Sequence, residues 1–151
     1  MEGLITDVLR LEESDFKSLV ETRVILETKA AQYAAKRRTP EDIIEIEKAL
    51  KAYENKVKQK ESAVEEDLMF HLKIAEASKN SVLKSLMLII TPDIVTSFLK
   101  YKVCDDETVE NKVMEEHENI LKCIVDGDSE AAGKAMASHL QDILEFGKSM
   151  E

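Results

Sequence analysis

The chain has 151 residues, of which 31 are Asp or Glu and 21 are Lys or Arg, so its formal net charge is −10. This length fits one domain, and a composition of 44% apolar and 34% charged residues is typical of a globular protein. With four Gly, two Pro and 5% aromatic residues, the sequence disfavours a many-stranded sheet. The acidic balance argues against nucleic-acid binding by this chain, because affinity for phosphates depends on a basic surface.

Cysteine usage and the ends of the chain indicate where the protein works. Cys104 and Cys123 are too few and too far apart for a disulfide framework or a Cys-x-x-Cys metal site, so we expect reduced thiols. Glu2 and Asp7 stand where a signal peptide would be basic. The longest apolar stretch, Val82 to Leu99, is interrupted by charged residues and a proline, so it is too short for a membrane span. The sequence therefore predicts a cytoplasmic protein with no membrane segment.

Helical spacing of apolar residues continues along almost the whole chain. Residues 1–14 carry a short apolar pattern and are interpreted as a lead-in segment before one domain of residues 15–151. The predicted helices run from Asp15 to about Arg38, from Pro40 to about Gln59, from Ser62 to about Ser78, from Asn80 to Thr91-Pro92, from Asp93 to Val103, from Thr108 to Val125, and from Asp128 to about Lys148. The expected fold is therefore an all-α antiparallel bundle of six or seven helices.

Helix-capping residues support these boundaries. Thr39 precedes a proline at the first helical position, and Ser62 with Glu65 has the spacing of a capping box. Ser14, Asn80 and Asp128 are the other predicted caps. Pro92 is expected to kink or end the helix that reaches it, because proline lacks the backbone N–H.

Polar residues interrupt three of the apolar stripes that should face the core. All three histidines of the chain lie on these inward faces, and Asp67 lies one helical turn from His71. The stripes read Val64, Asp67, Leu68, His71 and Ala75; then Val109, Val113, His117, Ile120 and Ile124; and then Ala132, Ala135, Met136, His139, Ile143 and Phe146.

Two interpretations of the inward histidines remain open on periodicity alone. A single inward histidine is usually a core residue that is satisfied by a hydrogen bond. Three inward imidazoles and one carboxylate instead suit a divalent transition metal, with room for water or an oxygen ligand. Zinc is the first candidate for such a site, and nickel, manganese or iron are alternatives.

Arg23 interrupts the stripe of the first predicted helix, which reads Phe16, Leu19, Arg23, Leu26, Ala30 and Ala34. One interpretation is an arginine that extends to the surface or pairs with Glu27 or Glu21. The other is a guanidinium that binds a carboxylate ligand, which its planar fork fits with two hydrogen bonds. Periodicity alone does not decide between these roles.

Four segments, taken in order, resemble a known family. Residues 67–80, DLMFHLKIAEASKN, resemble the signature of the FCD domain, the helical effector-binding half of FadR-type regulators in the GntR family of bacterial transcription factors. Residues 21–27 resemble the first-helix motif of that family, residues 116–128 its sixth-helix motif and turn, and residues 131–140 its last helix. The resemblance covers about residues 15 to 147.

This resemblance implies a helical bundle with a central ligand cavity and a homodimeric assembly. In the metal-containing branch of the family, one Asp and three His hold a divalent cation, and these map onto Asp67, His71, His117 and His139. Arg23 would face the effector, a small organic acid whose carboxylate can reach the metal. The resemblance also implies a basic winged helix-turn-helix domain ahead of this one, which would bind DNA, and no segment of this chain matches it.

We therefore predict a ligand-sensing regulatory domain and not an enzyme, with no catalytic residue. A metal-dependent hydrolase-like helical enzyme is the first alternative, because an open metal site can activate water. Against it, the chain has no His-Glu-x-x-His motif, and Glu-x-x-His is also absent. The second alternative is a purely structural helical bundle that oligomerises, which would bind no metal.

Overall fold

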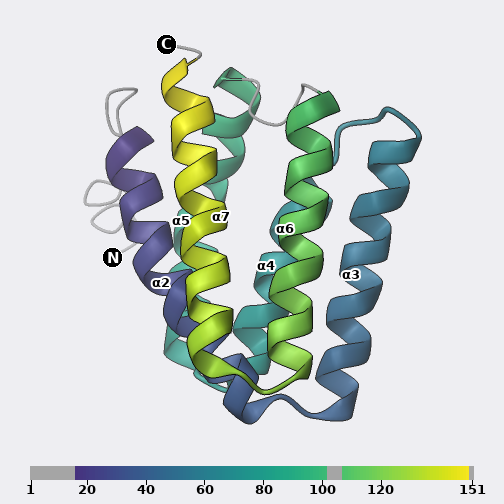
Figure 1. The fold of residues 1–151 in the computed structure, drawn as a ribbon. Helices are drawn as coiled ribbons and strands as arrows, with labels where there is room; N and C mark the ends of the chain where they lie inside the picture. Colours follow the sequence, from purple (N-terminus) through teal and green to yellow (C-terminus); the bar gives the residue numbers. More distant parts are fainter. Residues whose placement is uncertain (1–15, 102–106, 150–151) are drawn as a thin grey trace.

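The computed structural model describes residues 16–101 and 107–149, without the side chains of Phe16, residues 95–109, Leu144 and residues 146–149. Within these ranges it contains helices and no strand. The helices are α2 (Phe16–Arg37), α3 (Pro40–Lys58), α4 (Val64–Ala77), α5 (Ser81–Tyr101), α6 (Glu107–Val125) and α7 (Ser129–Ser149). Consecutive helices run in opposite directions (Figure 1), which confirms the predicted all-α antiparallel bundle.

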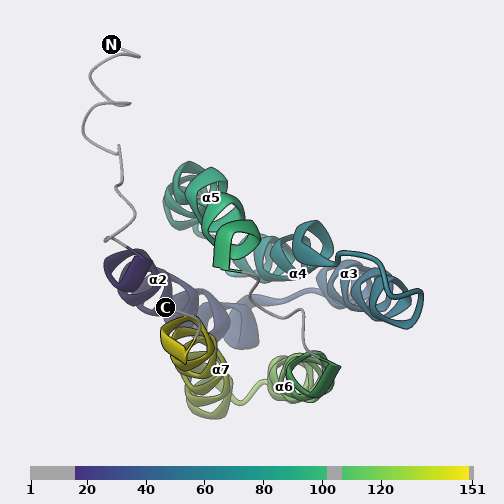
Figure 2. The same ribbon diagram turned by 90° about the horizontal axis from the view of Figure 1, so that it is seen from above.

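Five of these helices surround a common centre. Seen from above (Figure 2), α2, α7, α6, α3 and α4 follow one another around the bundle, and α5 lies outside against α4 and α2. Helix α2 also contacts α6, so it packs against four of the other described helices. The side chains that α4, α6 and α7 direct into the bundle therefore meet at its centre.

Small residues allow α2 and α7 to pack closely. Helix α2 buries Ala30, Ala31, Ala34 and Ala35, each at most 1% exposed. On α7, a Cβ atom built at Gly133 would lie 2.6 Å from Nε2 of the Gln32 side chain, so a larger residue there would require that side chain to move. The contact brings the inward face of α7 directly against α2, where Arg23 also lies.

Most of the predicted caps are present, and one is wrong. The side chain of Asn80 accepts a hydrogen bond from the N–H of Leu83 at 3.0 Å, and that of Asp128 accepts one from Ala131 at 3.1 Å. Ser62 does not cap α4, because the helix begins at Val64 and its N-cap residue is Ala63, whose side chain makes no capping hydrogen bond. The capping box predicted for Ser62 and Glu65 therefore does not form, while Ser14 lies outside the described residues.

Thr39→Ala should lower the free energy of unfolding by about 1 kcal/mol. The Thr39 hydroxyl accepts from the N–H of Asp42 at 3.2 Å, and the Asp42 carboxylate accepts from the N–H of Thr39 at 2.9 Å, so α3 has the complete capping box. Urea unfolding measures the difference. Ser62→Ala is the matched control and should leave stability unchanged, and equal losses in the two variants would contradict the assignment of caps.

Pro92 neither ends nor divides its helix, which corrects the prediction of two helices between Asn80 and Val103. Helix α5 continues through Pro92 to Tyr101. Pro92 is exposed, so water can replace the backbone hydrogen bond that the proline removes. The Thr91 hydroxyl donates to the carbonyl of Met87, one turn earlier, at 2.7 Å.

The inward stripes predicted for α4, α6 and α7 are confirmed where their side chains are described. Helix α6 buries Val113, His117, Ile120 and Ile124, and α7 buries Ala132, Met136, His139 and Ile143. The side chains of Phe16, Val109 and Phe146 lie outside the described residues, as does Cys104. Cys123 forms no disulfide with a described residue. In the described part of the chain, every helix is too short or too polar to cross a membrane.

Candidate metal centre

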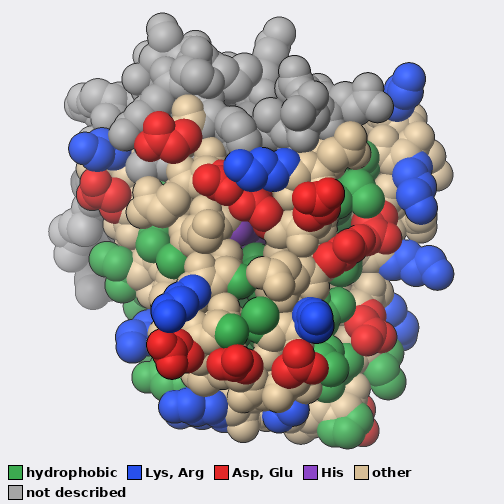
Figure 3. All heavy atoms as spheres, in the orientation of Figure 1, with side chains coloured by type: hydrophobic (Ala, Val, Ile, Leu, Met, Phe, Trp, Pro, Cys, Tyr) green, Lys and Arg blue, Asp and Glu red, His purple; other side chains and the backbone are tan. Residues whose placement is uncertain are grey.

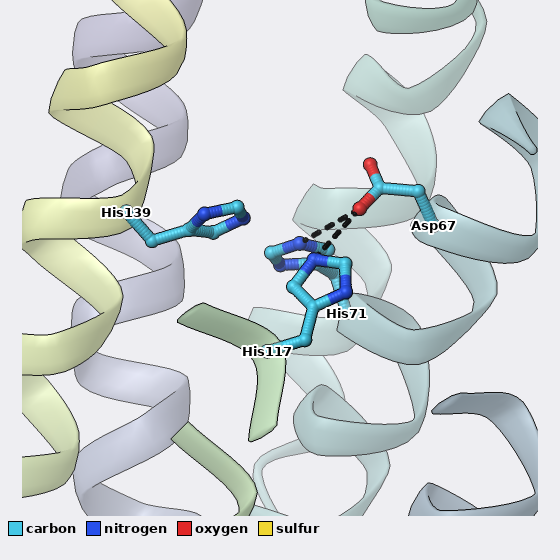
Figure 4. A group of neighbouring side chains, drawn as sticks. All are labelled: Asp67, His71, His117 and His139. Atoms are coloured by element: carbon cyan, nitrogen blue, oxygen red, sulfur yellow. Dashed lines mark ion pairs between the residues drawn. The ribbon is translucent and has the colours of Figure 1, made fainter. Parts of the chain in front are cut away.

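Asp67, His71, His117 and His139 meet at the centre of the bundle. Asp67 and His71 come from successive turns of α4, His117 from α6 and His139 from α7 (Figure 4). Each offers one ligand atom, and these four atoms all lie within 4.8 Å of one another. Atoms that bind one ion at about 2.1 Å lie up to about 4.2 Å apart, so the donors stand close to the spacing of one coordination sphere.

The contacts inside this cluster are not ordinary hydrogen bonds. The Nε2 atom of His117 lies 2.9 Å from Oδ1 of Asp67, and Nε2 of His71 lies 3.5 Å from the same oxygen. All of these atoms are buried, yet neither they nor Nε2 of His139 has a partner in hydrogen-bonding geometry. Buried polar atoms without partners are costly, so donors that converge in this way fit a cation held between them.

Aromatic rings enclose one side of the cluster. The ring centroids of His117 and Phe70 lie 4.5 Å apart, and those of His117 and Tyr53 lie 4.9 Å apart in an edge-to-face arrangement. The rings of His71 and His139 are stacked at 5.3 Å. These packed rings restrict the rotation of the imidazoles, so the ligand atoms are held in place before any ion binds.

The cluster is deeply buried but lies beneath a depression of the surface. Figure 3 shows a hollow between α6 and α7 with a histidine side chain at its bottom and acidic side chains around it. The opening is narrow, because each of the three imidazoles is at most 2% exposed. Asp67 is 4% exposed. A small ion or ligand atom that reached the cluster would meet negative charge on the way.

Two glutamates stand behind the histidines. The Glu27 carboxylate contacts Nδ1 of His71 with one oxygen and Nε of Arg23 with the other. The Glu116 carboxylate lies 3.1 Å from Nδ1 of His139. In both cases the carboxylate occupies Nδ1, so Nε2 is the nitrogen that remains for the cluster.

The model of the FCD domain family matches residues 18–142 of the chain. The chain belongs to the FCD family. This confirms the family resemblance, and the four residues to which the resemblance assigned the metal are those that the fold brings together.

Solved structures and curated relatives agree with this assignment. A structure titled Streptococcus agalactiae GntR matches the FCD domain with a TM-score of 0.77 and 25% identity, over 89% of this chain and 61% of that chain. Escherichia coli McbR/YncC shares the fold, with a TM-score of 0.82 at 15% identity over 93% of this chain and 71% of that chain.

The relatives are regulators of transcription. The HTH-type transcriptional regulator LutR of Bacillus subtilis is 30% identical over 142 residues, which cover 92% of this chain and 65% of that protein. The Uxu operon transcriptional regulator of Escherichia coli is 30% identical over 130 residues, which cover 83% of this chain and 51% of that protein. The FCD domain thus spans about half to two thirds of these relatives. The names of these relatives agree with the prediction of a regulatory domain rather than an enzyme.

Burial and neighbouring charge divide the imidazoles of the FCD domain into two kinds. Burial lowers the pKa of His139 well below its usual range and also lowers the pKa of His117, although Asp67 opposes the second shift. Burial would lower the pKa of His71 as well, but the carboxylates of Glu27 and Asp67 outweigh it and the pKa is raised. His117 and His139 are therefore neutral, and their nitrogens are available to bind a metal. At His71, a metal would have to compete with a proton for the same nitrogen.

The carboxylates of the site differ in the same way. Burial would raise the pKa of Asp67, but His71 and His117 hold it well below its ordinary value, so Asp67 stays charged. Burial and the neighbouring Asp142 raise the pKa of Glu116 to about 8. Asp67 is therefore the carboxylate that carries a negative charge at pH 7, whereas Glu116 is mostly protonated at that pH in the absence of a cation.

Arg23 is buried beside this site, at 2% exposed. The interpretation that it extends to the surface is wrong, and of its two proposed partners the structure places it against Glu27. Two residues were missed by sequence reasoning as parts of the site. Glu27 lies at helical spacing from Arg23 and Ala30, which was an available signal, whereas Glu116 carries no periodic signal because it is partly exposed.

Proposed function

We propose that this FCD domain is the ligand-sensing half of a transcriptional regulator, and that Asp67, His71, His117 and His139 hold a divalent transition metal. The observation that carries the proposal is the convergence of four buried donor atoms without hydrogen-bonding partners. Three neutral nitrogens and one carboxylate oxygen suit zinc first, with nickel, manganese or iron as alternatives. The bound cation would supply a Lewis-acidic centre for an oxygen ligand.

Metal analysis of the purified chain tests this function. We expect about one equivalent of a transition metal per chain, or tight uptake of one zinc ion by the chelator-treated protein. Asp67→Ala/His71→Ala should abolish uptake, whereas Glu118→Ala, which changes an exposed carboxylate beside His117, should leave it intact. A wild-type chain that takes up no metal would favour a purely structural bundle.

Zinc affinity should fall about tenfold for each pH unit below the pKa of His71. The sign follows from competition, because a proton on Nε2 must leave before that nitrogen can bind zinc. Since burial lowers the pKa of His117 and of His139 while the pKa of His71 is raised, His71 is the imidazole that takes up a proton first as the pH falls. Competition titrations with a chromophoric chelator between pH 5 and pH 8 would measure the slope, and a hundredfold or steeper change per unit would show that more than one imidazole is protonated.

The proposed effector is a small organic acid. Arg23 is buried and contacts the Glu27 carboxylate, which in turn contacts His71, so its positive charge lies beside the metal centre where it would favour an anion. Arg23 is therefore our proposed effector-contacting residue. Isothermal titration with acetate, L-lactate and succinate would test this on zinc-loaded wild type and on Asp67→Ala/His71→Ala. Equal affinities in the two proteins would contradict a metal-mediated effector site.

Effector binding would be transmitted through the helices that supply the site. Contacts from α2, α4, α6 and α7 meet at one point, so a ligand there fixes the relative positions of four helices. A signal arises only if the ligand prefers one arrangement of these helices. We propose that an attached domain at the N-terminal side reads this arrangement on DNA, in a cytoplasmic homodimer. The same proposal includes a cavity at the centre of the bundle in which the effector would bind.

A further inference from the structure

Arg23, Glu27 and His71 form a continuous chain of buried contacts. Arg23 and Glu27 lie one turn apart on α2, and His71 faces them from α4. The side chains of Arg23 and Glu27 are 3% and 1% exposed, and that of His71 is 2% exposed. Ionic groups are retained at such depth only when each is paired, so the contacts between them are specific.

The two oxygens of Glu27 have different partners. Oε1 contacts Nδ1 of His71, and Oε2 contacts Nε of Arg23. A carboxylate is only an acceptor, so the nitrogen that faces it must carry the hydrogen. Glu27 therefore selects the form of His71 with a proton on Nδ1, and in that form Nε2 presents its lone pair towards Asp67, 3.5 Å away.

His139 provides an internal comparison for His71. Its Nδ1 also faces a carboxylate, that of Glu116 at 3.1 Å, but Glu116 is 17% exposed and adjoins Asp142 rather than an arginine. Glu27 is thus the more buried of the two carboxylates, and it is the one in direct contact with a buried cation. That cation, Arg23, lies one turn away on the same helix and contacts the oxygen of Glu27 that does not face His71.

We propose that Glu27 is a positioning residue of the metal centre: it fixes the orientation and tautomer of His71, with Arg23 as its counter-charge. This inference rests on the proposed function, because it assumes that His71 binds the metal. The inference also gives Arg23 a role within the protein, because its guanidinium would stabilise the Glu27 carboxylate that holds the metal ligand His71. Residues that hold a metal-bound histidine in this way commonly change metal affinity 10- to 100-fold when they are replaced.

Zinc affinity of variants of the 151-residue chain tests the proposal. Glu27→Gln keeps the size of the side chain but removes its charge and its preference for one tautomer of His71. We expect its zinc affinity to fall about 10- to 100-fold at pH 7.5. Glu116→Gln is the matched exchange at His139 and should have a smaller effect, because Glu116 is more exposed and less firmly anchored.

Two additions separate positioning from folding. Arg23→Met/Glu27→Gln removes both charges, so it keeps the protein folded if Glu27→Gln alone leaves Arg23 too costly to bury. Its zinc affinity should still be reduced about 10-fold or more, and the visible absorption of its cobalt(II) form should differ from wild type because one ligand is held differently. Wild-type zinc affinity and an unchanged cobalt spectrum in the folded double variant would overturn the proposal. If wild type itself bound neither metal, the proposed function would fail as well, so the two failures are distinguishable.

Discussion

Removal of zinc with a chelator should lower the melting temperature of the wild-type chain by about 10 °C. A ligand that binds only the folded state at a thousand times its dissociation constant stabilises that state by about 4 kcal/mol. In a chain of this length, 1 kcal/mol corresponds to roughly 2 to 4 °C. The metal-free fold buries the donor atoms of Asp67, His71, His117 and His139 without hydrogen-bonding partners, and relief of that cost is one source of the affinity for the metal.

Thermal unfolding followed by circular dichroism, with zinc and then with chelator, measures this effect. Asp67→Ala/His71→Ala is the control, since it should unfold at the same temperature with and without the chelator. A wild-type chain with one bound zinc ion whose melting temperature did not respond to the chelator would contradict a metal site that is built into the core.

Helical periodicity was sufficient to place the metal-binding candidates on inward faces. Each of Asp67, His71, His117 and His139 interrupts an apolar stripe, and each is buried. Periodicity cannot show that the three stripes face the same point, because that depends on how α4, α6 and α7 pack. The family resemblance supplied this information in advance, and the packing explains it.

The chemistry behind the ligands was less accessible to sequence reasoning. The predicted stripe of the first helix included Leu26, but Leu26 is only partly buried and Glu27 is fully buried. Glu27 lies four residues after Arg23 and three before Ala30, so it belongs to the same buried face of α2. A search for an apolar stripe passes over it because its side chain is charged, and it was considered only as a partner of Arg23.

Two predicted helix boundaries were wrong because the surrounding structure outweighed the local sequence signal. Pro92 is a helix breaker by its chemistry, yet α5 continues through it at an exposed position where water can satisfy the backbone. Ser62 has the spacing of a capping box, but α4 starts later. The first turn of α4 instead has three acidic residues, Glu65, Glu66 and Asp67, whose negative charges interact favourably with the helix dipole. In both cases the local signal was weaker than the structural setting.

Arg23→Met should lower the free energy of unfolding of the metal-free protein by about 3 to 5 kcal/mol. The substitution keeps most of the apolar volume but leaves Glu27, at 1% exposed, without its main counter-charge. Burial would raise the pKa of Glu27, and Arg23 together with His71 is what lowers it. Without Arg23, the carboxylate must either remain as a poorly compensated buried charge or take up a proton and weaken its contact with His71. Urea unfolding in the presence of a chelator measures the loss.

The double variant Arg23→Met/Glu27→Gln should recover most of that stability, because no uncompensated charge is left in the core. Lys17→Met is the matched surface control: Lys17 and Glu21 have the same spacing on the same helix as Arg23 and Glu27, but their side chains are 65% and 57% exposed. Its effect should stay below about 0.5 kcal/mol. If Arg23→Met cost no more than Lys17→Met, the buried pair would contribute nothing to the fold, and Arg23 would be present for its ligand alone. A large loss that Glu27→Gln relieves would instead show that the guanidinium and the carboxylate behind His71 act as one unit.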